Sequence, residues 1–233
     1  SDSGGGAGIQ ADLKTMTALG VYGTSAICAL TAQNTRGVQG VELVSPAFVV
    51  AQIDSILSDI DVRAAKTGML ANAAIVSAVA DRMGQATHIP LVVDPVMIAT
   101  SGDSLLTPDS VDAVCKKLLP RARIITPNLP EAAALLGGKE AKTGAEVVAQ
   151  ARALMAFGSR AVLVKDGHGT GAEVADVLID GDTVHVFKKA RIEAANTHGT
   201  GCTLSAAIAS YLALGHDLPS AVEKAQDFVW KAI

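Results

Sequence analysis

The sequence lacks the features of several protein classes. Charged residues make up only 18% of the 233 residues, and the formal net charge of -4 leaves no basic excess for nucleic acid or an anionic membrane surface. No apolar run approaches the roughly 20 residues that cross a bilayer, and no basic and apolar leader stands at the start. We therefore expect neither nucleic acid nor a membrane as a partner.

Cysteine is also scarce. Cys28, Cys115 and Cys202 are an odd number and show no CxxC spacing, which argues against a disulfide framework and against a zinc site. This usage favours a reducing, cytoplasmic location. No internal repeat, linker or low-complexity segment divides the chain, so we expect one domain over residues 1–233.

The apolar pattern predicts an α/β fold. Hydrophobic residues make up 49% of the chain, as in proteins whose sheet is covered on both faces. Apolar spacing predicts helices at 9–19, 46–57, 71–83, 108–119, 128–136, 144–157, 201–214 and 219–233. Strands are predicted at 21–31 (buried), 62–66, 91–93, 123–125, 161–164, 174–179 and 183–187, the last two as a hairpin. We expect a three-layer αβα sandwich around a mostly parallel sheet, with ligands beyond the carboxyl ends of the strands.

The segment from Asn196 to Thr203 is the most informative motif. Gly199 and Gly201 let the backbone approach a ligand, and the helix start behind them leaves amide N–H groups without partners. These donors and the positive end of the helix dipole predict an anion site, which we interpret as a phosphoryl-transfer centre. Cys202 is either inert packing or a base, because a helix N-terminus lowers a thiol pKa from ~8.5 towards neutrality.

Other nucleotide-binding signatures are incomplete. There is no GxxxxGK[ST] phosphate loop, because the segment at 137–140 reads GGKE. Residues 6–11 match GxGxxG/A, but no acidic residue follows near the usual offset of ~20 residues, which disfavours a nicotinamide cofactor. The glycine-rich loop at 3–8 either contacts phosphate or substrate, or is simply a tight turn ahead of a helix.

Polar side chains follow three predicted strands. Asp94 serves a metal or phosphate site, or caps the turn before Pro95. Asn128 and Glu131 form a capping box, contact a magnesium nucleotide, or do both. Lys165 reaches a nucleotide phosphate or is solvated beside its turn.

Two histidines stand in turns near these motifs. We expect His168 and His198 to be loop residues that make hydrogen bonds rather than catalysts.

Taken together, six segments resemble the hydroxymethylpyrimidine/phosphomethylpyrimidine kinase family of thiamine biosynthesis. The resemblance runs in order over almost the whole chain and lies at residues 1–15, 32–37, 66–70, 94–97, 125–132 and 198–203. It implies a ribokinase-like fold, ATP and Mg²⁺ as cofactors, a homodimer, and two successive phosphorylations of 4-amino-5-hydroxymethyl-2-methylpyrimidine. It also implies that the family's first strand and its C-terminal segment lie outside these 233 residues.

The resemblance also assigns site residues. Gln33 would bind the pyrimidine edge, with Ala7, Met69 and Val96 as apolar walls around the ring. The implied catalytic and phosphate-binding groups are Asp12, Lys165, Cys202 and the backbone of Gly199 and Gly201. The implied nucleotide and metal contacts are Asn128, Glu131 and Thr200 for the nucleotide, and Asp94 and Glu131 for the metal. Asp166 stands where the family commonly has glycine, which places a carboxylate beside Lys165.

Two rival functions stay open at this stage. A pyridoxal kinase would hold another ring with a hydroxymethyl arm, and Gln33 is the feature that favours a pyrimidine. A non-catalytic pyrimidine-binding domain would keep the fold without phosphoryl transfer, but the presence of Asp12, Lys165 and Cys202 together argues against it.

Overall fold

One sheet of six strands organises the molecule. The computed structural model describes residues 1–97, 107–166, 171–194 and 197–233. The strands of the large sheet follow one another in chain order from β3 to β8, and a separate two-stranded sheet pairs β1 with β2. The strands are β1 Ala29–Asn34, β2 Gly37–Leu43, β3 Ala65–Thr67, β4 Leu91–Val93, β5 Ile124–Ile125, β6 Ala161–Val164, β7 Glu173–Asp180 and β8 Thr183–Ala190.

The helices connect these strands and cover the sheet. They are α1 Gly8–Ala18, α2 Pro46–Leu57, α3 Ala73–Gln85, α4 Pro108–Ala113, α5 Leu129–Leu136, α6 Gly144–Met155, α7 Thr200–Ala213 and α8 Leu218–Ala232. Pairing is parallel from β3 to β6 and antiparallel from β6 to β8. Parallel neighbours direct their carboxyl ends to the same edge of the sheet, and this arrangement gathers the loops after β3 to β6.

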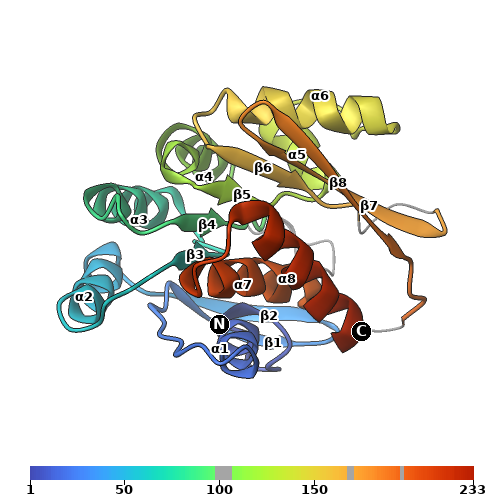
Figure 1. Ribbon diagram of the computed structural model, residues 1–233. Coiled ribbons are helices and arrows are strands. Elements are labelled where there is room, and N and C mark those ends of the chain that lie inside the picture. Colours follow the sequence, from blue (N-terminus) through green and yellow to red (C-terminus); the bar gives the residue numbers. More distant parts are fainter. Residues whose placement is uncertain (98–106, 167–170, 195–196) are drawn as a thin grey trace.

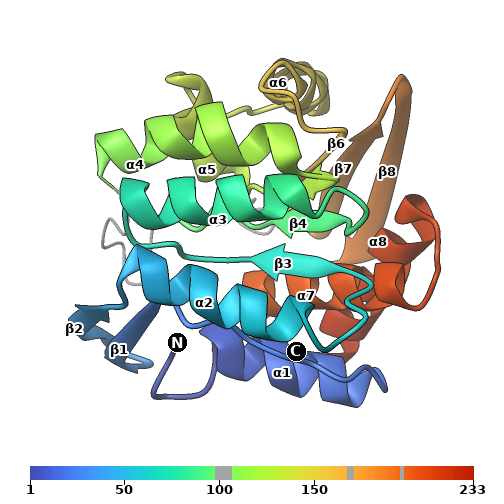
Figure 2. The same cartoon turned by 90° about the vertical axis from the view of Figure 1, so that its left-hand side faces the viewer.

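Alternation along the strands creates two apolar layers. Val93 and Ile125 pack with the helices on one face, whereas Val92 and Ile124 pack with α7 and α8 on the other. Figure 1 shows α7 and α8 on one side of the sheet and α3, α4 and α6 on the other. In Figure 2, α2, α3 and α4 lie side by side in front of the sheet. The predicted three-layer αβα architecture with a mostly parallel sheet is confirmed.

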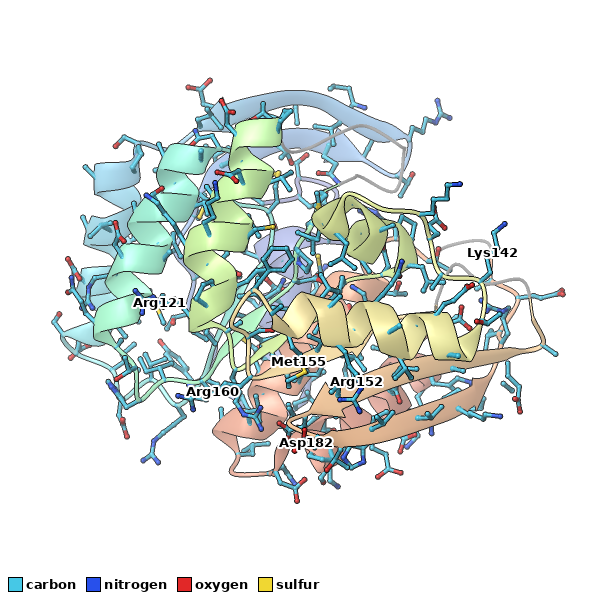
Figure 3. All side chains as sticks on the ribbon, turned by 90° about the horizontal axis from the view of Figure 1, so that it is seen from above. Arg121, Lys142, Arg152, Met155, Arg160 and Asp182 are labelled. Carbon is cyan, nitrogen blue, oxygen red and sulfur yellow. The ribbon has the colours of Figure 1, made fainter. Side chains whose placement is uncertain are left out.

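Seen from above, α6 crosses the part of the sheet that contains β6, β7 and β8 (Figure 3). Lys142 precedes its first turn, and Arg152 and Met155 lie near its last turn. A capping box starts α6: Thr143 accepts the Glu146 amide, and the Glu146 carboxylate accepts the Thr143 amide. This helix lies away from the site described below, so it serves the fold.

The helix predicted at 108–119 is continuous only in part. After α4 the backbone changes to a π-helix at Val114–Leu118 and then to a 3-10 turn at Leu119–Arg121. Pro120 lies in this turn, and proline cannot donate the hydrogen bond that an α-helix would need there. None of the helices in the described ranges has the length and apolar content to cross a bilayer.

The buried strand predicted at 21–31 is wrong for most of its length. Residues 21–28 form no strand, β1 begins only at Ala29, and Tyr22 is 84% exposed. Both backbone groups of Ile27 bond to the side-chain amide of Gln52, at 2.9 and 3.1 Å, instead of to a neighbouring strand. Apolar composition indicated a strand, but a strand also needs a backbone partner, and the sequence pattern carries no information about that partner.

Candidate active site

All of the predicted site residues line one extended cavity of about 1140 Å³. The cavity is lined by the glycine-rich loop, α1 and the first turn of α7, and it continues along residues 56–66 to the end of α8. The predicted residues on its wall are Ala7, Asp12, Gln33, Met69, Asp94, Val96, Asn128, Glu131, Lys165, Gly199, Thr200, Gly201 and Cys202. The structure therefore brings together groups that lie almost 200 positions apart in the chain.

Asp94 is the hub of the polar network below the cavity. Its side chain follows β4 and is 2% exposed. The Thr126 hydroxyl and the Lys165 ammonium donate to Oδ1 at 2.9 and 3.0 Å, and the Ser205 hydroxyl donates to Oδ2 at 3.3 Å. A buried carboxylate requires such partners, so Asp94 fixes the position of Lys165 whatever else it binds.

Lys165 is held between acidic groups. Burial works to lower its pKa, but the carboxylates of Asp94 and Glu131 raise it on balance. A Cβ placed on Gly201 would lie 3.4 Å from the Lys165 nitrogen, so the ammonium lies against the backbone of the predicted anion turn. The lysine is therefore charged and faces the place where an anion would sit.

Glu131 has an unusual proton affinity. Burial, with Asp94 nearby, raises the pKa of Glu131 to about 7 against the opposing effect of Lys165. The Glu131 side chain accepts the Asn128 amide, and the Asn128 side chain accepts the Glu131 amide, both at 2.8 Å, so the capping box is present. The capping alternative holds for this motif, and a nucleotide contact by the same residues stays a prediction.

The donor set suits magnesium only in combination with a substrate. No group of three or more His, Cys, Asp or Glu side chains that could hold a metal ion occurs within the described ranges. Asp94 and Glu131 supply two carboxylates beside the cavity. Mg²⁺ in phosphoryl-transfer sites uses one or two carboxylates with phosphates and waters as the remaining ligands, so these two residues fit such an ion.

A second buried ion pair was not predicted from the sequence. Lys66, the middle residue of β3, bonds both carboxylate oxygens of Asp12 from α1, at 2.8 and 3.0 Å. Burial works to lower the pKa of Lys66, but Cys202, Asp12 and Asp94 raise it on balance. Lys66 belongs to one of the family-like segments and is the last residue of the strand predicted at 62–66. This was the only sequence signal for its place in the site.

Cys202 differs from expectation in its acidity. A helix N-terminus was predicted to lower its pKa. Burial instead raises the pKa of Cys202, and Lys66 and a backbone hydrogen bond from Gly8 only partly oppose this effect. Loss of water around the sulfur is the larger influence. The thiol is therefore protonated at neutral pH in the ligand-free protein.

The turn before Cys202 has the predicted geometry. α7 begins after Gly199, whose φ of 84° is left-handed, and no side chain caps this helix in the described structure. The Thr200 hydroxyl bonds to the carbonyl of Thr197 at 2.9 Å. The Thr200 amide donates to the carbonyl of Thr197 at 3.2 Å and the Thr203 amide to that of Gly199 at 2.8 Å, so the amides of Gly201 and Cys202 are those of the first helical turn that can point at a ligand in the cavity.

The glycine-rich loop and the two histidines have separate outcomes. His198 forms a hydrogen bond with Asp2, Nε2 to Oδ2 at 3.0 Å, which confirms its predicted loop contact, whereas His168 lies outside the described residues. Burial works to raise the pKa of Asp2, but hydrogen bonds from His198 and two loop amides lower it on balance. Sequence reasoning had assigned no role to Asp2.

The substrate side of the cavity and Asp166 complete the site. The Gln33 amide oxygen accepts the Thr31 hydroxyl at 3.2 Å, so the side chain has a defined orientation on β1. Asp166 was expected to place a negative charge beside Lys165. Its carboxylate accepts the Ala175 amide at 3.3 Å and lies 4.0 Å from Arg191.

Comparisons with known proteins show the family of this chain. A family model described as phosphomethylpyrimidine kinase matches residues 2–233. The hydroxymethylpyrimidine/phosphomethylpyrimidine kinase of Rhizobium meliloti (strain 1021) is 55% identical over 236 residues, which cover 100% of this chain and 87% of the relative. Both results extend over the segments that carry the site residues.

Solved structures share the fold. The crystal structure of phosphomethylpyrimidine kinase from Clostridium difficile 630 gives a TM-score of 0.88 at 40% identity and covers 100% of this chain and 95% of that chain. An ADP complex of Bacillus subtilis pyridoxal kinase gives a TM-score of 0.90 at 37% identity, and the match covers 98% of this chain and 86% of that chain. The predicted ribokinase-like fold is confirmed by these neighbours. The match over residues 2–233 shows that the chain belongs to the phosphomethylpyrimidine kinase family.

Proposed function

We propose that both phosphorylations of the family reaction take place in this one cavity, within a single kinase domain formed by residues 1–233. The enzyme is a phosphotransferase of thiamine biosynthesis, and its substrates are 4-amino-5-hydroxymethyl-2-methylpyrimidine and the monophosphate of that compound. The observation that supports a shared site is the convergence of the predicted ring walls, Lys165 and the α7 turn on one cavity. Pyridoxal kinase is a structural relative, and the rival of a non-catalytic domain is set aside by membership in a kinase family.

In this proposal, each part of the cavity has one task. Ala7, Met69 and Val96 hold the flat ring, and Gln33 recognises its edge with an amide that both donates and accepts. The hydroxymethyl arm then points to the α7 turn.

Charge stabilisation is the main contribution to the rate. Phosphoryl transfer depends chiefly on positioning and on offsetting charge on the phosphoryl oxygens. Within the segment 199–202 the Thr200 amide already bonds to Thr197. The amides of Gly199, Gly201 and Cys202 and the Lys165 ammonium would therefore hold these oxygens, and loss of one such donor typically costs ~10²–10³ in rate. In its thiolate form, Cys202 would accept the proton of the substrate hydroxyl. This form is a minor fraction at neutral pH, because burial raises the pKa of Cys202.

ATP is the proposed phosphoryl donor. A structural neighbour was solved with ADP, and we place the nucleotide near Asn128, Glu131 and Thr200, which line the cavity on the Lys165 side. Mg²⁺ would be held by Asp94 and Glu131 and would offset phosphate charge.

The assay is coupled ATP turnover with the hydroxymethylpyrimidine, then with its monophosphate, and with pyridoxal for comparison. We expect turnover with both pyrimidines and a lower kcat/KM with pyridoxal. Turnover with only one of the pyrimidines would contradict a shared site. A higher kcat/KM with pyridoxal would contradict the role of Gln33.

We also propose a homodimer in the cytoplasm. The β1–β2 hairpin carries Leu30 on one face and Val41 and Leu43 on the other, and each of these residues is 47% to 50% exposed. Phe48 in the adjoining α2 is 61% exposed. A two-stranded sheet with such exposure is marginal in water, so a second copy is the occupant that we infer. The three free cysteines suit a reducing compartment.

A further inference from the structure

A buried carboxylate organises the glycine-rich loop. Asp2 is 1% exposed. Its Oδ1 accepts the Gly4 amide at 2.8 Å, and its Oδ2 accepts the amides of Gly6 at 3.1 Å and Ala7 at 2.8 Å. The same Oδ2 bonds to Nε2 of His198 at 3.0 Å. Three amides from one loop and an imidazole from a turn 196 positions away therefore share one side chain.

The loop and the turn also touch through their backbones. A Cβ added to Gly199 would lie 1.7 Å from the carbonyl oxygen of Gly6, and a Cβ added to Gly6 would lie 2.8 Å from Cδ2 of His198. No side chain fits between these segments. The backbones of the loop and the turn are therefore in direct contact.

One further hydrogen bond, from the Gly8 amide to the Cys202 thiol, joins the two segments, whereas two others hold each segment to its own surroundings. The Ser3 hydroxyl donates to the carbonyl of Gln33 at 2.7 Å, and the Thr200 hydroxyl donates to the carbonyl of Thr197 at 2.9 Å. The contact between Asp2 and His198 instead crosses from one segment to the other, and it is charge-assisted because Asp2 is a carboxylate.

We propose that Asp2 and His198 are positioning residues: they form a clasp that holds the substrate loop at 3–8 against the phosphate-binding turn at 199–202. This inference rests on the proposed function. The clasp fixes the position of Ala7, a wall of the ring pocket, relative to the amides of the α7 turn. Neither clasp residue has to touch the substrate, because the pair acts through the loop and the turn that it joins.

The expected effect is on the catalytic step. A misplacement of about 1 Å between a bound substrate and a catalytic group can reduce the rate about 100-fold. Loss of the clasp lets the loop and the turn move apart. Of the three proposed ATP contacts, Thr200 lies in this turn, but Asn128 and Glu131 belong to another element. The kcat should therefore fall while the KM for ATP stays close to that of the wild type.

The experiment compares three histidine variants of the full chain. His198→Leu removes the hydrogen bond, and His198→Gln keeps a side-chain amide that can donate to Asp2. The matched control is His88→Gln, an exposed histidine that does not line the cavity. We measure kcat, the KM for each substrate and thermal unfolding.

We expect His198→Leu to lose about 10- to 100-fold in kcat with the KM for ATP unchanged, and His198→Gln to recover most of the loss. His88→Gln should behave as the wild type. If Asp2→Asn folds, the double variant with His198→Leu should lose no more kcat than either single variant, because both changes break the same contact.

Three results would overturn the clasp. The first is an unchanged kcat in His198→Leu. The second is an equal loss in His198→Leu and His198→Gln that follows the drop in folded protein, because this would indicate a purely structural contact. The third is a wild-type chain that phosphorylates neither pyrimidine, which would remove the proposed function and the inference with it. In the first two cases the wild type remains active, so the two kinds of failure can be told apart.

Discussion

At the scale of single residues, Cys202 is the clearest test of the chemistry. It lines the cavity at the start of α7 next to the anion turn. Cys202→Ala should fold normally and lose about two to four decades of kcat, the usual range for a lost general base. Steady-state kinetics measures this, with Cys115→Ala, from the buried π-helix, as the control. Unchanged turnover in Cys202→Ala would remove the thiol from catalysis.

The acidity of Cys202 gives a second residue-scale prediction. Because burial raises its pKa above the ordinary value of 9.0, the thiolate fraction at pH 7.5 is smaller than that of a free cysteine. Alkylation by iodoacetamide, followed by peptide mass spectrometry in the ligand-free protein, should be slow at neutral pH and still increase above pH 9. Cys28, whose pKa burial raises to about 11, is an internal reference. A rate for Cys202 that levels off below pH 8 would contradict the raised pKa.

At the scale of elements, the start of α7 depends on a glycine for two reasons that can be separated. Gly199 and Gly215 have nearly the same left-handed φ, 84° and 89°, but only Gly199 has backbone atoms where a Cβ would stand. Each change to alanine should cost about 1–2 kcal/mol of unfolding free energy for the backbone conformation. Gly199→Ala should in addition lose about 100-fold in kcat, because the loop and the turn must separate. Equal activity of the two variants would show that this contact is unimportant.

The ion pair between α1 and β3 is a second element-scale feature. The side chains of Lys66 and Asp12 are 3% and 14% exposed. Lys66→Met leaves a buried carboxylate without its partner and should lower the unfolding free energy by about 3–5 kcal/mol. Arg63→Met removes an ion pair with side chains 71% and 75% exposed, and should cost at most about 1 kcal/mol. Urea unfolding compares them, and similar losses would refute the structural importance of the buried pair.

At the scale of the whole molecule, the exposed apolar hairpin should control association. Leu43→Glu places a charge on the face of the hairpin that carries Val41 and should convert the proposed dimer to a monomer. Light scattering after size-exclusion chromatography measures the mass. Val184→Glu changes a partly exposed residue on β8, outside this surface, and should leave the dimer intact. A wild-type monomer at all concentrations tested would contradict the proposal.

The fold was predictable where a local pattern was sufficient. Helical spacing predicted α2 with the same bounds as in the structure, and a short apolar run predicted β4. The pattern failed at 21–28, where apolar residues lack a strand partner, and it missed the β1–β2 pair, which needs two segments to be considered together. The glycines for which we propose a role through the backbone, such as Gly199, were predicted because glycine at a helix start permits close approach of the backbone to a ligand.

The order of helices and strands and the motifs that mark a kinase follow from local sequence, because spacing, helix caps and glycines act over a few residues. Only the tertiary structure decided that Lys66 pairs with Asp12, that His198 bonds to Asp2, and that burial makes Cys202 a weaker acid. Those outcomes depend on distances between segments far apart in the chain and on how much water remains around each group. Neither quantity is encoded in any short stretch of sequence, so both arise only when the layers pack.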